Sequence, residues 1–89
     1  MAKFNITVTE TFKDNFGKLS PEEQTLVERK VELLSENPSH PSLRCKRVEG
    51  KPGYFESSAN MDIRMIWRYE AGGIIAIVDI GHHDVLRKY

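Results

Sequence analysis

The feature that most constrains this chain is a change in the spacing of its apolar residues near Pro41. Before it, residues 21–36 place leucines and valines three and four positions apart, which is typical of a helix with one apolar face. After it, the segment "MDIRMIWRYE" alternates apolar and polar residues, which is typical of a strand with one buried face. Such a chain is predicted to pack helices against one face of a sheet.

Local signals predict the order of the elements. "KFNITVT" alternates like a strand, and Phe12 and Phe16 fit a short helix. Ser20 and Glu23 form a capping box at the start of a second helix, which the prolines after residue 37 end. "LRCKRV" and "YFESS" are strand candidates, and "AGG" is a hairpin turn leading into the buried strand "IIAIVDI".

We therefore expect one α+β domain over residues 1–89. It would contain an N-terminal strand, a helical hairpin and then a mainly antiparallel sheet of three to four strands, because short links force antiparallel pairing. Alternation places Met61 and Tyr69 on the apolar face of their strand, and Arg64 and Arg68 on the solvated face. The expected core contains Phe12, Phe16, Leu26, Val31, Leu34, Met65 and Trp67.

Composition excludes several classes of protein. The single cysteine, Cys45, rules out an intrachain disulfide, and it is expected to pack as a small apolar residue. No apolar run approaches the roughly 20 residues of a membrane span, and the N-terminus does not resemble a signal peptide. We therefore expect a cytoplasmic protein. The net charge is zero, but acids dominate the helical half and bases the strand half, so a local basic face is expected.

Three segments together resemble the RelE/ParE superfamily of toxins: "HPSLRCKRVEG", "YFESSANMDIRMIW" and "DIGHHDVLRKY". The resemblance is strongest to its ribosome-dependent messenger-RNA endonucleases of the RelE and YafQ kind. It implies metal-free cleavage in the ribosomal decoding site, by attack of a 2′-hydroxyl on the adjacent phosphate. It also implies that the chain binds a cognate antitoxin, the ribosome and messenger RNA, and that the toxin–antitoxin complex binds operator DNA. No cofactor or membrane is implied.

The resemblance also implies roles for individual residues. The chemistry needs proton transfer, for which histidine is suited, and positive charge at the phosphate, for which arginine is suited. The candidate catalytic residues are His83, Arg64, His40, Asp62 and Glu56. The candidate RNA- or phosphate-binding residues are Arg44, Lys46, Arg47, Arg68 and Tyr89.

Alternatives remain for several of these residues. Ser58 stands where YafQ-like toxins can carry a histidine, so Glu56 is a candidate substitute base. His82 is expected to be structural or to flank the substrate, and "HHD" lacks the third and fourth ligands of a metal site. Two other functions fit the same fold: a ParE-like inhibitor of DNA gyrase, and a catalytically inactive relative that acts only by binding.

Overall fold

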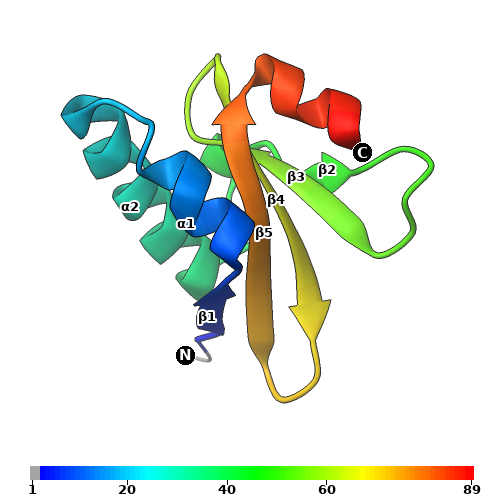
Figure 1. Cartoon of the computed structure of the whole chain (residues 1–89). Helices are drawn as coiled ribbons and strands as arrows, with labels where there is room; N and C mark the ends of the chain where they lie inside the picture. Colours follow the sequence, from blue (N-terminus) through cyan, green and yellow to red (C-terminus); the bar gives the residue numbers. More distant parts are fainter. Residues whose placement is uncertain (1–2) are drawn as a thin grey trace.

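A single five-stranded sheet forms the centre of the protein, as Figure 1 shows. The computed structural model describes residues 3–89, apart from the side chain of Lys88. The strands lie in the order β1-β5-β4-β3-β2 across the sheet. Their bounds are β1 Asn5–Val8, β2 Lys46–Arg47, β3 Tyr54–Ser58, β4 Ile63–Glu70 and β5 Ile74–His82. The four later strands pair antiparallel, as expected from their short links.

The N-terminal strand pairs with the last one. β1 runs parallel to β5, with Asn5 opposite Ile74 and Val8 opposite Ile77. Both helices and three other strands lie between these two strands along the chain, so the connection is long enough for parallel pairing. The prediction of a strand, a helical hairpin and a mainly antiparallel sheet is thus confirmed, with the first strand joined to the same sheet.

Helices α1 (Glu10–Phe16) and α2 (Pro21–Glu36) cover one face of the sheet (Figure 1). The predicted capping box is present, because the Ser20 side chain accepts from the Glu23 N–H and the Glu23 side chain accepts from the Ser20 N–H. None of the described helices is long and apolar enough to cross a membrane. The expected core residues all belong to the cluster beneath the helices: Phe12, Leu34, Met65 and Trp67 are buried, and Phe16, Leu26 and Val31 pack against them.

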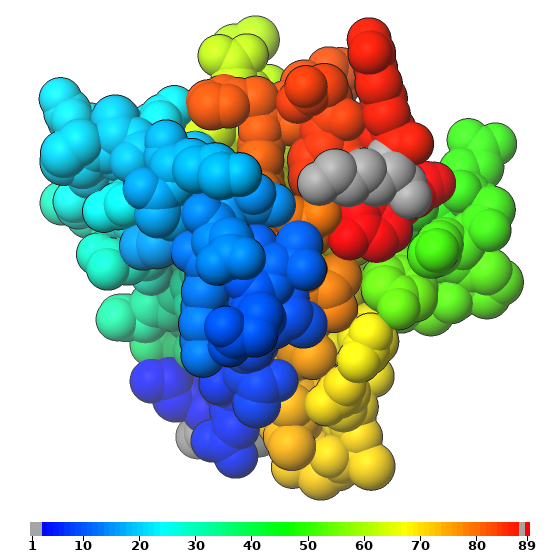
Figure 2. Space-filling view, viewed as in Figure 1, coloured from blue at the N-terminus to red at the C-terminus, as the bar shows by residue number. Residues whose placement is uncertain are grey.

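The second face of the sheet is not simply solvated. A short 3-10 helix, η1 (Pro41–Leu43), precedes β2, and a longer one, η2 (His83–Lys88), ends the chain and folds back over the sheet. Val48, Ile66 and Val78 form a small apolar cluster there, and Leu86 and Tyr89 pack against it. In Figure 2 this C-terminal segment, in orange and red, lies between α1 in blue and the residues around β3 in green.

Met61 does not lie on the apolar face of β4, because it precedes the strand, so that part of the prediction is wrong. Met61 is 85% exposed and Tyr69 is 48% exposed. The physical reason at Met61 is a loop, because the Asn60 side-chain oxygen accepts the N–H groups of Asp62 and Ile63 and β4 begins only at Ile63. Tyr69 does lie on the predicted face, because its ring packs edge-on against Phe55 and Trp67, with centroids 5.6 and 5.1 Å apart.

Candidate functional site

A polar cleft of about 220 Å³ lies on the sheet face that η2 partly covers, and it is called the cleft below. Its lining residues are Arg44, Lys46, Glu56, Ser58, Arg64, His83 and Leu86. They come from the segment before β2, from β2, β3 and β4, and from η2. The lining holds three permanent cations, one histidine and one carboxyl group. It therefore combines anion binding with groups able to transfer protons.

The strand register explains why these residues meet. Lys46 lies opposite Glu56, and Ser58 lies opposite Arg64. Side chains of directly opposed residues share one face of a sheet, and Glu56 and Ser58 share a face because they are two residues apart. All four side chains thus point to the face that the helices leave uncovered.

Glu56 is the acid in this lining, and it is largely buried. Its side chain is 11% exposed, and its Oε1 lies 3.9 Å from Nζ of Lys46, whose side chain is 71% exposed. A pair at this distance with one exposed partner is weak.

Arg64 is held in place by the loop before its own strand. Its Nη1 donates to the carbonyl oxygens of Asn60 and Met61, both at 2.9 Å, and of Ile63 at 3.3 Å. Within the described part of the chain, Nε and Nη2 make no hydrogen bond. This edge of the guanidinium is the one that could grip a phosphate through two parallel bonds.

His83 reaches the cleft because the chain turns sharply after β5. A Cβ at Gly81 would lie 3.1 Å from Cβ of Val85, so a larger residue there would require η2 to shift by a few tenths of an ångström. His83 opens η2 and is exposed, with Leu86 beside it in the lining of the cleft.

The end of η2 is anchored by a buried carboxyl group. Asp79 on β5 is fully buried and accepts from the Tyr89 hydroxyl at 3.0 Å and from the Asn15 amide at 2.7 Å. Burial, together with the bond to Asp79, raises the pKa of Tyr89 to about 12. Asp79 thereby links both α1 and Tyr89 to β5, the strand that leads to His83.

The fold is shared with solved toxin structures. No known family model matches the sequence, and no curated protein matches it. The toxin–antitoxin complex RelBE2 from Mycobacterium tuberculosis matches with a TM-score of 0.79 and 20% identity, covering 93% of this chain and 94% of that one. The E. coli DinJ–YafQ toxin–antitoxin complex matches with a TM-score of 0.77 and 13% identity, covering 94% and 97%. This chain has the RelE-type toxin fold.

The RelE-type fold does not by itself select an activity. The YoeB/ParE toxin from Agrobacterium tumefaciens also matches, with a TM-score of 0.76 and 12% identity, covering 90% of this chain and 99% of that one. Toxins with different names thus share the fold at low identity. The side chains of the cleft, not the fold, must decide what the chain does.

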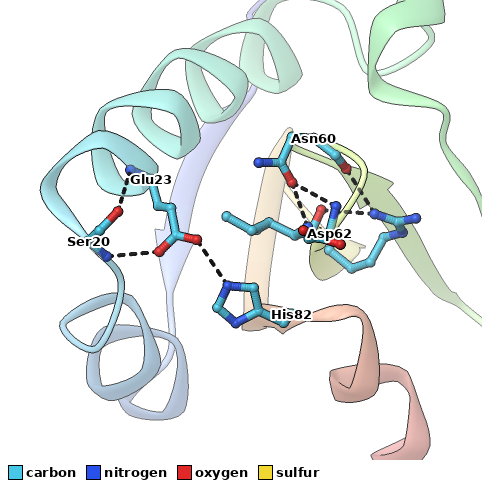
Figure 3. Close-up of polar contacts among 7 residues, drawn as sticks. Ser20, Glu23, Asn60, Asp62 and His82 are labelled. Atoms are coloured by element: carbon cyan, nitrogen blue, oxygen red, sulfur yellow. Dashed lines mark hydrogen bonds and ion pairs between the residues drawn. The ribbon is translucent and has the colours of Figure 1, made fainter.

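His82 lies outside the cleft and joins β5 to α2, as Figure 3 shows. Its Nε2 donates to Oε2 of Glu23 at 3.0 Å, and this bond raises the pKa of His82. Glu23 also closes the capping box of α2, so one carboxylate serves both contacts. Within residues 3–89, no group of three or more His, Cys, Asp or Glu side chains is placed to hold a metal ion.

Two candidate catalytic residues do not line the cleft. His40 caps η1, because its Nδ1 accepts from the N–H of Ser42 at 3.1 Å and lies 2.9 Å from the Ser42 hydroxyl. His40 lines a neighbouring groove that shares Arg44 and Lys46 with the cleft. Asp62 is exposed on the loop before β4, where its charge contributes to the raised pKa of His82. Figure 3 shows Asp62 beside Asn60 in this loop.

Three of the candidate RNA-binding residues also lie elsewhere. Arg47 lines the groove beside His40. Arg68 pairs with Glu70 at 2.9 Å and donates to the Tyr54 hydroxyl at 3.0 Å. The Tyr89 hydroxyl is engaged by Asp79, so any contact with a phosphate would have to replace that bond. Of the five candidate RNA-binding residues, the cleft gathers Arg44 and Lys46.

Sequence reasoning missed Asp79, although a signal was present. "IIAIVDI" is an apolar run interrupted by one charged residue, and a carboxyl group in a buried strand needs partners. The structure supplies them at a bulge, because Ile66 lies opposite Asp79 while Trp67 lies opposite Ile77, which leaves Val78 unpaired.

Proposed function

We propose that this chain is the toxin of a toxin–antitoxin pair and that it cleaves messenger RNA on the ribosome without a metal ion. The observation that carries the proposal is the content of the cleft: His83, Glu56 and Arg64 line one recess together with Arg44 and Lys46. A binding module would need only the cations. Two groups able to transfer protons beside a phosphate-sized anion site favour catalysis.

The reaction is an internal transfer of the phosphoryl group. The 2′-oxygen of one nucleotide loses its proton and attacks the phosphorus on its own 3′ side, and the bond from phosphorus to the 5′-oxygen of the next nucleotide breaks. The leaving 5′-oxygen takes a proton. The products are a 2′,3′-cyclic phosphate and a 5′-hydroxyl, so no water or oxidant is consumed.

We assign the two proton transfers to His83 and Glu56, with the order between them left open. Histidine exchanges protons near neutral pH, and a carboxylate can accept one. Arg64 would hold the phosphate through its Nε and Nη2 edge and stabilise the extra negative charge of the transition state, with Arg44 and Lys46 beside it.

The candidates outside the cleft are assigned to flanking roles. His40 and Arg47 would contact RNA in the neighbouring groove, which shares two cations with the cleft. Asp62 is assigned no step in the cleft, because it lies on the exposed loop before β4. Arg68 and Tyr89 would serve RNA binding only at the expense of their bonds to Glu70 and Asp79.

The partners follow from the same proposal. The structures from M. tuberculosis and E. coli are complexes of a toxin with its antitoxin. We propose a cognate antitoxin for this chain, operator DNA as a ligand of the pair, and a cytoplasmic location where ribosomes are available.

Paired substitutions of the two adjacent histidines test the catalytic assignment. His83→Gln removes the titrating group from the cleft, so cleavage of messenger on programmed ribosomes should fall by roughly 10²- to 10⁴-fold. His82→Gln is the matched control, because His82 lies outside the cleft, and it should cleave as the unaltered protein does. Circular dichroism checks that both variants fold. Full activity of His83→Gln would remove this residue from the mechanism.

A ParE-like inhibitor of DNA gyrase is the second candidate, because the Agrobacterium YoeB/ParE toxin shares the fold. A supercoiling assay with purified gyrase separates the two functions. Inhibition of gyrase by both the unaltered protein and His83→Gln, without cleavage of messenger, would favour this alternative. Ribosome binding without cleavage would favour a catalytically inactive relative.

A further inference from the structure

A second recess adjoins the cleft, and it is called the Lys30 recess below. It has a volume of about 260 Å³ and is lined by Lys30, Ser42, Arg44, Ser58, Ala59, Asn60, Met61 and Arg64. Arg44, Ser58 and Arg64 also line the cleft. The two recesses therefore lie side by side, with two arginines on the boundary between them.

The charge of the Lys30 recess is one-sided. Lys30, Arg44 and Arg64 supply three cations, and the lining contains no acid, whereas the cleft contains Glu56. Such a surface attracts an anion and has no carboxylate to neutralise it from within. The absence of a histidine or carboxylate also separates the two recesses chemically: the Lys30 recess can bind a phosphate but has no group suited to proton transfer.

Lys30 is placed for this role by α2. Its Nζ lies 3.5 Å from the Ser42 hydroxyl, so the side chain extends from the helix toward η1. This long contact in an exposed position adds little to stability. An incoming phosphate could therefore take the ammonium group at a small cost to the fold.

Arg44 caps the C-terminal end of η1 in the left-handed backbone conformation, with its N–H donating to the Pro41 carbonyl oxygen. Its φ is +49°, and it is the one non-glycine residue with positive φ among residues 3–89. A side chain in this region strains the backbone by about 1 kcal/mol, and glycine would avoid that strain. Keeping a guanidinium here is consistent with a binding role, since strained residues concentrate at functional sites.

Met61 adds an apolar surface at the same place. It is 85% exposed, and it belongs to the lining of the recess. The Asn60 side chain fixes the loop that carries it, because its oxygen accepts two backbone N–H groups. The polarisable thioether of Met61 suits contact with an aromatic base, and the cations beside it suit contact with a phosphate. The recess therefore offers a surface for both parts of a nucleotide.

We propose that the Lys30 recess is a second nucleotide subsite of single-stranded RNA. It holds the phosphate next to the one in the cleft through Lys30 and Arg44, while Arg64 on the boundary holds the phosphate in the cleft, and Met61 contacts the base of that nucleotide. The inference rests on the proposed function, because it treats the cleft as the place where the scissile phosphate binds. It predicts that RNA with two phosphates binds more tightly than RNA with one.

Binding of two short probes tests the subsite without any cleavage step. The probes are 2′-O-methyl uridine dinucleotide, with one phosphate, and the trinucleotide, with two; neither can react. Titrations of the full chain, labelled with ¹⁵N, are followed by NMR. The trinucleotide should bind more tightly, and it should shift the amide signals of Asn60 and Met61 more than the dinucleotide does.

Two matched variants locate the effect. Lys30→Met keeps the apolar stem and removes the charge, so it should weaken trinucleotide binding by roughly three- to tenfold and leave dinucleotide binding unchanged. The slope of log affinity against log salt should become shallower by about 0.7, the value for one phosphate contact to a single strand. Arg29→Met removes the neighbouring exposed charge on α2, which is outside the recess, and should change neither probe.

Three results would overturn the subsite. The first is that the two probes bind equally well, or that neither binds. The second is that Lys30→Met binds the trinucleotide as tightly as the unaltered protein does, and the third is that Lys30→Met and Arg29→Met lose the same amount of trinucleotide affinity. The proposed function fails on a different readout, the His83-dependent cleavage of messenger. Cleavage with any of these three binding results removes only the subsite. If trinucleotide binding depends on Lys30 but no messenger is cleaved, the chain has an RNA-binding surface and the proposed catalytic activity is refuted.

Discussion

The hydrogen bond between Tyr89 and Asp79 gives a prediction whose size follows from the structure. Tyr89→Phe removes a 3.0 Å bond to a carboxyl group that is fully buried. The loss of such a bond should reduce the free energy of unfolding by about 1–3 kcal/mol. For a domain of this length, the midpoint of thermal unfolding should fall by roughly 5–20 °C. Cleavage should also fall, because the same bond anchors the helix that begins with His83.

The pH dependence separates this bond from a general packing effect. The pKa of Tyr89 is raised above its usual value near 10 to about 12, first by burial and then by Asp79. The stability that the protonated hydroxyl contributes is therefore complete below pH 10 and is lost as the pH rises through about 12. The difference in the free energy of unfolding between the unaltered protein and Tyr89→Phe should therefore shrink as the pH rises from 10 to about 12.

Thermal unfolding followed by circular dichroism measures both effects. Tyr69→Phe serves as the control, because Tyr69 is 48% exposed and its hydroxyl should contribute less than about 0.5 kcal/mol. A midpoint for Tyr89→Phe within 2 °C or so of the unaltered protein would refute the reasoning. An advantage of the unaltered protein that persists above pH 12 would also refute it.

Three further predictions concern the cleft and its surroundings. Arg64→Ala should lower both RNA binding and the cleavage rate at saturation, and Arg64→Lys should restore only part of each, because a point charge cannot form a two-bond grip; single-turnover kinetics on ribosomes checks this. Arg44→Gly should keep or slightly raise the melting temperature while it weakens RNA binding, because glycine relieves the positive φ. The pKa of His82 is raised by its bond to Glu23. The stability that this pair contributes should therefore be present below pH 6.5 and decline as the pH rises through the raised pKa. His82→Gln should remove this pH dependence from thermal unfolding curves.

The parts of the fold that the sequence predicts well are those fixed by local chemistry. Ser20 and Glu23 mark the start of α2 because a helix terminus needs partners for its free N–H groups, and the structure has this capping box. The turn at 71–73 joins two strands of period two, and both of its glycines have positive φ. These signals act within a few residues of each other.

The parts that could not be predicted depend on residues far apart in the chain. Nothing near Asn5 shows that it will lie beside Ile74, because the two residues are 69 positions apart in the sequence. The six residues of η2 are too few to show a helical period, so the second apolar cluster with Leu86 was not expected. Met61 fits the alternation of β4, but the Asn60 side chain holds the residues that follow it in a loop, so the strand begins only at Ile63.

The candidate site shows the same division. The family resemblance, combined with residue chemistry, suggested His83, Arg64 and Glu56 as candidates, but it could not say which of the ten candidates share a cleft. That depends on the register of β2, β3 and β4 and on the fold of η2. His40 was a candidate because of the resemblance to YafQ-type toxins, whereas in the structure its Nδ1 caps a short helix.

The chemistry of the cut ends tests the central claim most directly. The chain would be added to ribosomes programmed with one messenger, and the termini of the fragments would be determined. Attack by the 2′-hydroxyl predicts a 2′,3′-cyclic phosphate on the upstream fragment and a 5′-hydroxyl on the downstream one, with both absent from the His83→Gln reaction. A 3′-hydroxyl upstream with a 5′-phosphate downstream, or an intact messenger, would contradict the mechanism proposed for this cleft.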